Sequence, residues 1–184
     1  MEIVIGILAV LVAVVAVAVI AFYNNLVQLR NRVDNAWAQV DVQLQRRLDL
    51  IPNVVETVKG YAAHENSTLE EVTQVRSAVS QAATPGAKLM ADTTLTHALK
   101  SLFAIAEAYP DLKANVNFQQ LQTELANTED KISYMRQSYN DVVMKYNTAI
   151  ETFPGVLVAS MFHFEKRELF DANAAAETAP TVSF

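Results

Sequence analysis

The feature that most constrains this chain is an uninterrupted apolar run over residues 3–22. Its sequence, IVIGILAVLVAVVAVAVIAF, contains no charged side chain and a single glycine. At a rise of about 1.5 Å per residue, a helix of this length spans about 30 Å, the thickness of the hydrocarbon layer of a bilayer. We therefore predict a single transmembrane anchor over residues 1–22.

A cleaved signal peptide is the competing interpretation of this run. Signal peptides carry a basic segment and about 7–15 apolar residues before a small-residue cleavage site. Here only Met1 and Glu2 precede the run, the run is longer, and the helical pattern continues through residues 23–29. The sequence therefore favours a retained anchor.

Two features of the composition exclude several classes of function. The sequence has no cysteine, which removes disulfides, thiolate metal ligands, cysteine nucleophiles and lipid attachment through cysteine. Its net charge is −6, with charges of both signs mixed after the apolar run. Because nucleic-acid binding needs a basic face, we expect no nucleic-acid partner.

Residues 23–59 carry a helical stripe that follows directly on the apolar run. The stripe repeats in steps of three, four and four residues, a period typical of a nearly straight helix or a slightly right-handed supercoil. Pro52 lies inside it and removes one backbone hydrogen bond, so we expect a kink near Leu48 rather than a break. Gly60 marks the end of the helix. The stripe consists of Leu26, Leu29, Val33, Trp37, Val40, Leu44, Leu48, Ile51 and Val55, and we expect Trp37 in the core.

Turn and capping signals predict two shorter helices in the middle of the chain. Residues 67–70, Ser-Thr-Leu-Glu, match a capping box, so a second helix is expected to begin there and to end by Thr84. Pro85 and Gly86 form a turn signal. A third helix then runs to Pro110, and the polar residues 110–117 predict a loop.

The last long helix has the clearest periodicity. One row of side chains recurs every seven residues, and a second row fills the partner positions, as in a coiled-coil seam. The first row is Phe118, Leu125, Ile132, Tyr139, Tyr146 and Phe153, and the second is Leu121, Thr128, Met135, Val142 and Ala149. Pro154 and Gly155 end this helix.

Four helical segments with short connections predict an all-α fold. We expect a single N-terminal transmembrane helix that continues into an antiparallel four-helix bundle over residues 23–155, with long first and last helices. Residues 156–170 form an apolar tail segment that packs on the bundle, the membrane or a neighbour. Residues 171–184 are small and polar without periodicity, which predicts a disordered tail.

Three long blocks of this sequence resemble the LemA family. The first comprises residues 23–27, YNNLV, and residues 29–65, which include NAWAQVDVQLQRRLDLIPNVVETVKGY. The others are residues 106–147, which include YPDLKANVNFQQLQTELANTEDKISYMRQSYNDVV, and residues 153–170, FPGVLVASMFHFEKRELF. The resemblance covers nearly the whole chain, apart from residues 85–87 and the far tail.

The resemblance implies a bacterial membrane protein with an N-terminal anchor and a helical-bundle domain. It does not imply a settled biochemical activity. A magnetosome-associated branch of the family is linked to membrane invagination, and other members accompany genes for envelope stress and envelope proteases. These associations carry no catalytic residues over to this chain.

The sequence shows no constellation of catalytic or metal-binding residues. His64, His97 and His163 lack any close ligand spacing, so packing or solvated roles explain them better. Adjacent carboxylates such as Glu129 and Asp130 point in different directions on a helix and cannot serve as an acid–base pair. No nucleophile elbow or phosphate-binding loop is present. We therefore expect a protein that is not an enzyme, with no cofactor and no metal.

Basic residues near the anchor are candidate contacts with the membrane surface. Arg30 and Arg32 follow the predicted bilayer edge within about three turns, where attraction to anionic lipid is worth about 1 kcal/mol each. No basic residue precedes the apolar run, so the positive-inside rule places the bundle in the cytoplasm. Arg46 and Arg47 lie farther along, and we expect them to be solvated or to pair within the bundle.

The apolar tail segment is the candidate interaction surface. Exposure of its side chains would be costly, since each is worth about 1.5–3 kcal/mol when buried. They can be covered by the protein's own bundle, or by the bilayer interface or a neighbouring subunit, and the sequence leaves these alternatives open. The residues concerned are Val156, Leu157, Met161, Phe162 and Phe164.

Two tyrosines of the seven-residue row, Tyr139 and Tyr146, are each followed by asparagine. We interpret them as core residues whose hydroxyl groups lie at the rim of the bundle. The alternative is a polar ladder that recognises a partner helix.

These observations predict a membrane-tethered scaffold that organises or remodels the bacterial envelope through homo-oligomerisation. It would cross the inner membrane once, with the lipid bilayer and further copies of itself as partners. The alternative is an adaptor or regulatory subunit of another envelope membrane protein, such as a protease or a signalling system.

Overall fold

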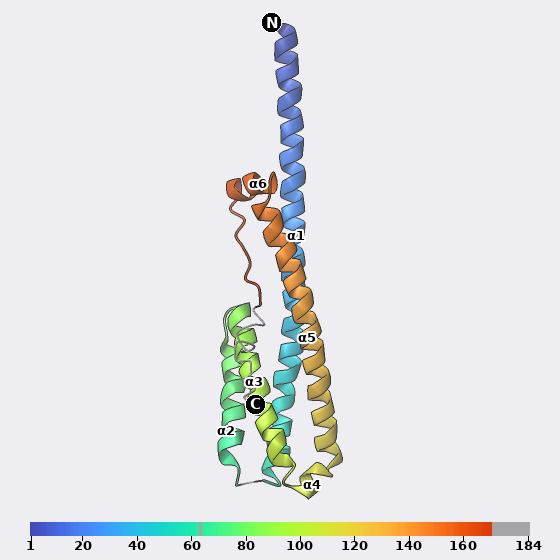
Figure 1. Ribbon diagram of the computed structural model, residues 1–184, viewed down its shortest axis with the longest axis vertical. Helices are drawn as coiled ribbons and strands as arrows, with labels where there is room; N and C mark the ends of the chain where they lie inside the picture. Colours follow the sequence, from blue (N-terminus) through green and yellow to red (C-terminus); the bar gives the residue numbers. More distant parts are fainter. Residues whose placement is uncertain (63, 171–184) are drawn as a thin grey trace, which may run out of the picture. The chain divides into compact units, whose positions relative to one another are not determined.

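The computed structural model describes residues 1–62 and 64–170, and the predicted disordered tail lies outside the described residues. All regular secondary structure in this part of the chain is helical (Figure 1). The helices are α1 (Glu2–Lys59), α2 (Asn66–Gln81), α3 (Pro85–Ala106), α4 (Pro110–Lys113), α5 (Val116–Glu151) and α6 (Gly155–Met161).

The predicted anchor and the first predicted bundle helix are one uninterrupted element, α1, which ends at Lys59 just before Gly60. Pro52 lies inside α1 without breaking it. Proline has no N–H, so the carbonyl group of Leu48 loses its partner within the helix. Arg76 of α2 donates a hydrogen bond from Nε to this carbonyl oxygen at 2.9 Å. Arg76 therefore supplies from another helix the hydrogen bond that Pro52 removes.

The described chain divides into two compact units. The anchor unit consists of Met1–Ala36 and Ser138–Leu169. The helical-core unit consists of Trp37–Gln137 together with Phe170. The long helices α1 and α5 each contribute one part to each unit.

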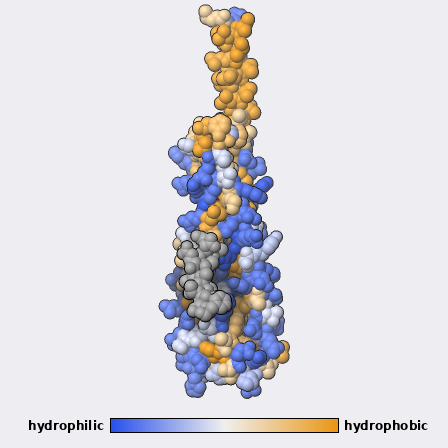
Figure 2. Space-filling view, in the orientation of Figure 1, coloured by the Kyte–Doolittle hydropathy of each residue, from blue (hydrophilic) through white to orange (hydrophobic). Residues whose placement is uncertain are grey.

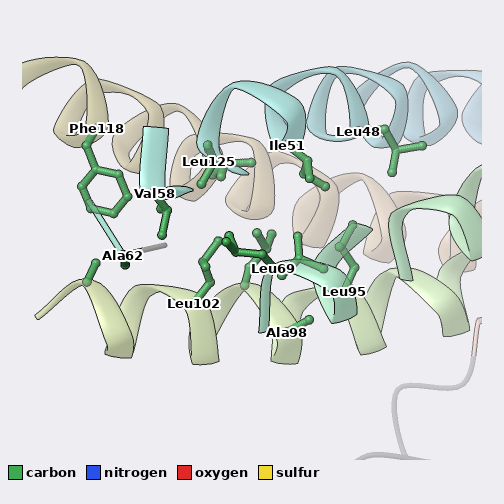
Figure 3. Packing of buried hydrophobic residues seen from close by; sticks show 14 of the residues in the cluster. Leu48, Ile51, Val58, Ala62, Leu69, Leu95, Ala98, Leu102, Phe118 and Leu125 are labelled. Carbon is green, nitrogen blue, oxygen red and sulfur yellow. The ribbon is translucent and has the colours of Figure 1, made fainter. Parts of the chain in front are cut away.

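The helical-core unit is built around a cluster of buried aliphatic side chains (Figure 3). Within this unit α2 and α3 lie side by side. Each fully buried Leu, Ile or Val contributes about 1.5–3 kcal/mol. The side chains shown in Figure 3 include Leu48, Ile51, Val58, Ala62, Leu69, Leu95, Ala98, Leu102, Phe118 and Leu125.

The stripe of α1 is confirmed along most of its length, with two differences. Leu29 and Trp37 are half-buried rather than part of the core. After Pro52 the buried face moves by one residue, so that Val54 and Val58 are buried and Val55 lies at the edge.

Two predictions about the short helices were wrong in detail. The capping box at residues 67–70 does not cap α2, which begins at Asn66 after Glu65 and has no side-chain cap. Pro85 does not form a turn but opens α3, and the Thr84 hydroxyl accepts a hydrogen bond from the Ala87 N–H at 3.2 Å. Proline suits the first helical position, since the N–H that it lacks would have no partner there.

The predicted loop after α3 contains a short helix. α3 already ends at Ala106, and Pro110 begins α4 instead of ending a helix. The polar residues of this region therefore form a helical turn between α3 and α5.

The seven-residue row of α5 is confirmed from Phe118 to Tyr146, where its members are buried. Phe153 was wrongly included. α5 ends at Glu151, so Phe153 leaves the helical frame and is 80% exposed. The second row also differs, because Val143 and Ile150 are buried in place of Val142 and Ala149. The buried side chains of α5 are Phe118, Leu125, Thr128, Ile132, Tyr139, Val143, Tyr146 and Ile150.

Candidate functional site

The N-terminal part of α1 exposes its apolar side chains. None of the residues in the most apolar 18-residue stretch of α1 is buried by the rest of the described chain. Figure 2 shows this part of the helix as a continuous hydrophobic surface. Among the described helices, α1 is the one long enough and apolar enough to cross a membrane. This is consistent with membrane anchoring.

α6 packs one face against the anchor unit. Its first residue, Gly155, is buried, and a Cβ at this position would lie 2.1 Å from the carbonyl oxygen of Ala149 in α5. Only glycine permits so close an approach. Val158 and Ala159 follow on the same face and are also buried. The structure therefore assigns one half of the apolar tail segment to packing within the chain.

The opposite face of α6 remains exposed and apolar. Leu157 is 60% exposed and Met161 63% exposed, and they lie one helical turn apart. Val156 and Phe162 border them and are also exposed. Figure 2 shows a hydrophobic patch over α6. Among the described residues nothing covers this face, so cover by the bilayer interface or by a neighbouring subunit stays a prediction.

An aromatic cluster connects α6 with α1 at the end of the apolar run. The ring of Tyr23, the first residue after this run, lies 4.7 Å from the ring of Phe162 and 5.7 Å from that of Phe164 (centroid distances). The guanidinium carbon of Arg30 lies 5.5 Å from the centroid of the Phe164 ring. Edge-on and cation–π contacts of this kind each contribute about 0.5–1.5 kcal/mol. The cluster places α6 beside the end of the apolar run.

After α6 the chain reverses direction at His163. This residue has φ 55°, in the left-handed region. The Phe164 N–H donates to the Ala159 carbonyl group at 2.9 Å, which is the bond that closes a Schellman motif. The reversal directs residues 164–169, which we call the strap, back along α5 without regular secondary structure.

The two tyrosines of the α5 row bind the backbone of the strap. The Tyr146 hydroxyl donates to the Glu165 carbonyl group at 2.8 Å, and the Tyr139 hydroxyl donates to the Glu168 carbonyl group at 3.2 Å. Both rings are buried, which confirms the interpretation of core tyrosines with hydroxyl groups at the rim. Burial raises the pKa of both hydroxyl groups, so they remain neutral donors at physiological pH.

Asn147 and two ion pairs complete the attachment of the strap. The Asn147 side chain donates to the Arg167 carbonyl group at 2.8 Å and accepts from the Arg167 N–H at 2.9 Å. The Arg167 guanidinium lies 3.2 Å from Asp34 of α1, and Lys166 pairs with Glu151 of α5. The sequence analysis did not predict this contact, because the residues after α6 carry no pattern that indicates an extended segment.

The helical-core unit contains a buried charge cluster that the sequence analysis did not predict. The Arg47 guanidinium lies 2.8 Å from Asp92 and 2.6 Å from Glu129, and it donates to the Thr96 hydroxyl at 3.0 Å. Arg47 and Asp92 are almost completely buried. Of the two expected settings for Arg47, solvation or pairing within the helical part, the structure confirms pairing. Its neighbour Arg46 pairs at the surface with Glu124 at 2.9 Å.

A signal for this cluster was present in the spacing. Arg47 falls three residues after Leu44 and four before Ile51, on the buried face of α1, and Asp92 falls midway between Leu89 and Leu95 on α3. Burial raises the pKa of Asp92, and the nearby Arg47 opposes this shift. The cluster therefore acts as a structural ion pair between α1 and α3.

Most of the chain matches a known protein family. The LemA family model matches residues 36–184. The chain belongs to the LemA family. It is 30% identical over 158 residues to Protein LemA of Metamycoplasma hominis, covering 82% of this chain and 69% of the relative. It is 27% identical over 182 residues to Magnetosome protein MamQ 2 of Paramagnetospirillum magneticum and to Magnetosome protein MamQ of Magnetospirillum gryphiswaldense, covering 85% of this chain and 67% of each relative.

In this LemA-family chain, the residues predicted to contact the membrane surface lie in different settings. Arg30 belongs to the aromatic cluster beside α6, whereas Arg32 is exposed on α1. The histidines lie apart: His64 and His97 are exposed on the helical-core unit, and His163 forms the turn after α6. Among the described residues, no three His, Asp or Glu side chains are grouped as metal ligands would be.

Proposed function

We propose that this LemA-family protein is a non-enzymatic, membrane-tethered scaffold that organises or remodels the bacterial envelope by self-association. It crosses the inner membrane once through the apolar part of α1, and its helices lie on the cytoplasmic side. The placement of Arg30 and Arg32 shortly after the apolar run supports this orientation, because basic residues are enriched on the cytoplasmic side.

The observation that carries the proposal is the continuity of α1. A single hydrogen-bonded helix, Glu2–Lys59, contains both the exposed apolar run and the side chains buried in the helical core. The helix that can enter a membrane therefore also supplies part of the buried core. This property suits a protein that couples a membrane to a protein assembly. An antiparallel arrangement of α1, α2, α3 and α5 is the finer fold that we propose for the helical part.

Two further observations support a scaffold rather than an enzyme. The charged side chains that the helical core buries are engaged with one another, as the Arg47–Asp92 pair illustrates. Large apolar side chains also remain exposed outside the apolar run, which offers surface for contacts between copies. They include Val42, Met90, Val116, Tyr134 and Met144. The names of the MamQ relatives associate those proteins with the magnetosome, a membrane compartment.

The alternative is an adaptor for another envelope membrane protein. The binding of the strap backbone by Tyr139, Tyr146 and Asn147 is the observation that favours this alternative. A surface that holds an extended segment by its backbone can accept segments of different sequence.

Electron microscopy of the full-length protein extracted in mild detergent, combined with light scattering, distinguishes the two. A scaffold is expected to form large homo-oligomers of regular size at micromolar concentration. Monomers or small oligomers that persist at high protein concentration, and after reconstitution into vesicles, would contradict self-association. Enlargement only in the presence of a membrane extract would favour the adaptor.

A further inference from the structure

We propose that the exposed face of α6 inserts into the boundary between headgroups and acyl chains of the bilayer, in the leaflet from which α1 emerges. The protein would then have two membrane contacts, the apolar run of α1 and the outer face of α6. This inference rests on the membrane anchoring that is part of the proposed function, but it does not require self-association.

The position of α6 along α1 is the first argument. If residues 3–22 fill the hydrocarbon layer of about 30 Å, the headgroup layer on each side, about 5–7 Å thick, covers the next four or five residues of α1. Tyr23 lies in this layer, and its ring contacts Phe162 directly after α6. Tyrosine is also a residue enriched at membrane interfaces. α6 is therefore held at the depth where an interfacial helix lies.

The chemistry of the exposed face is the second argument. Leu157 and Met161 project from one side of α6, while Val158 and Ala159 are buried on another, so α6 is an apolar helix with one face packed against the protein and one face exposed. Phe153, immediately before α6, is exposed as well. Interfacial helices bury such faces about 5–10 Å into the boundary region. Leaving this patch in water would forgo the same hydrophobic stabilisation that holds the inner face of α6.

The third argument distinguishes the bilayer from a second copy as the occupant. The α6 patch lies beside the apolar surface of α1 within one compact unit (Figure 2). Whatever covers the apolar run at its cytoplasmic end must therefore come close to α6. Arg30, which belongs to the same aromatic cluster, lies just beyond this layer and adds a cation that can reach toward the lipid phosphates. Lipid both covers the apolar run and α6 and supplies phosphates for Arg30, so a second copy of the chain is not needed.

The experiment uses the full-length protein and its single tryptophan. Trp37 is replaced by Phe, and one tryptophan is then introduced as Leu157→Trp on the outer face of α6. Met144→Trp is the matched control, since Met144 is a similarly exposed apolar residue of the same unit on α5. Val12→Trp, within the apolar run, reports on anchoring itself. Each variant is reconstituted into phosphatidylcholine–phosphatidylglycerol vesicles, with and without lipids brominated on the acyl chains.

The expected result is that brominated lipid removes most of the emission of Val12→Trp and Leu157→Trp, and little of that of Met144→Trp. Blue-shifted but unquenched emission from Leu157→Trp would mean that protein covers α6, and it would overturn the proposal. Emission at the wavelength of exposed tryptophan would overturn it as well. Failure of quenching at Val12→Trp would instead contradict membrane anchoring, so the two failures are distinguishable.

Discussion

In the helical-core unit, aliphatic side chains from α1, α2, α3 and α5 meet in one buried cluster, with the Arg47–Asp92 pair enclosed beside it. In the anchor unit, the helices instead bury a narrow row that includes Leu26, Val33 and Tyr146. Beyond this row, its attachments are aromatic contacts and hydrogen bonds to the backbone of the strap. The helical-core unit is therefore stabilised by one large buried cluster, whereas the anchor unit combines a buried row with aromatic contacts and hydrogen bonds to the strap.

This difference has consequences for the behaviour of the two units. A buried cluster is lost all at once, whereas surface attachments can open one at a time with small changes in free energy. The anchor unit contains both the apolar run and α6, so the part that we propose to contact lipid is also the part able to adjust locally. Substitutions of buried residues in the helical-core unit should therefore cost more than substitutions that remove only an attachment of the strap.

The largest effect is expected for Arg47→Met in the helical-core unit. The substitution leaves Asp92 buried without the cation that lies 2.8 Å away, and uncompensated buried charges cost about 3–5 kcal/mol. Arg46→Met is the matched control, because the Arg46–Glu124 pair is largely exposed and is worth about 0–1 kcal/mol. Denaturant unfolding of the full-length protein in detergent, followed by circular dichroism, measures both.

Addition of Asp92→Leu to Arg47→Met should recover most of this loss, since an apolar pair can replace a buried ion pair at little cost. Hydrogen exchange should show the loss within the helical-core unit. Equal stability of Arg47→Met and Arg46→Met would contradict the account of the buried cluster.

An intermediate effect is expected for Arg76→Met. This substitution removes the donor to the Leu48 carbonyl group, and a buried acceptor without a partner costs about 1–3 kcal/mol. The cost should shrink in a Pro52→Ala background, because residue 52 then supplies its own N–H to the same carbonyl oxygen. A double-mutant cycle on the free energy of unfolding measures this coupling. An identical cost in both backgrounds would show that Arg76 does not compensate for Pro52.

The comparison also explains which parts of the fold could be predicted from the sequence. The long helices were predictable, because the spacing of residues such as Leu44, Leu48 and Ile51 directly reflects which face is buried. The starts of α2 and α3 could not be predicted in this way. Ser67 suits a helix cap as well as the first turn of a helix, and Pro85 suits a turn as well as the first position of a helix. At these positions the choice depends on a few local hydrogen bonds, such as that of Thr84.

The candidate site was predictable in composition but not in geometry. The apolar character of Leu157 and Met161 identified a surface, yet only the structure separates them from Val158 and Ala159 on the opposite face. The inner face of α6 packs back toward the end of α5, where Gly155 approaches Ala149, and a sequence period does not encode this packing. The strap was missed for a related reason, since its attachments are to backbone atoms and leave little mark on its own sequence.

The smallest effect is expected in the anchor unit, for Tyr139→Phe combined with Tyr146→Phe. Each substitution removes one hydrogen bond to the strap backbone, and a bond of this kind contributes about 0.5–1.5 kcal/mol. Tyr134→Phe is the matched control, because Tyr134 lies on the same helix with its side chain exposed. Hydrogen exchange of residues 164–169 should increase in the double variant and remain unchanged in Tyr134→Phe.

Tyr139 and Tyr146 also predict how the free energy of unfolding changes with pH. Burial raises the pKa of both tyrosines above the ordinary value of about 10, so the unfolded chain loses these protons at lower pH than the folded chain does. Their contribution is therefore fully present below about pH 10 and is lost as pH rises through the folded-state pKa values. The free energy of unfolding of the wild type should fall toward that of the double Phe variant over this range. A difference between the two proteins that stays constant from neutral to strongly alkaline pH would show that the buried hydroxyl groups do not hold the strap.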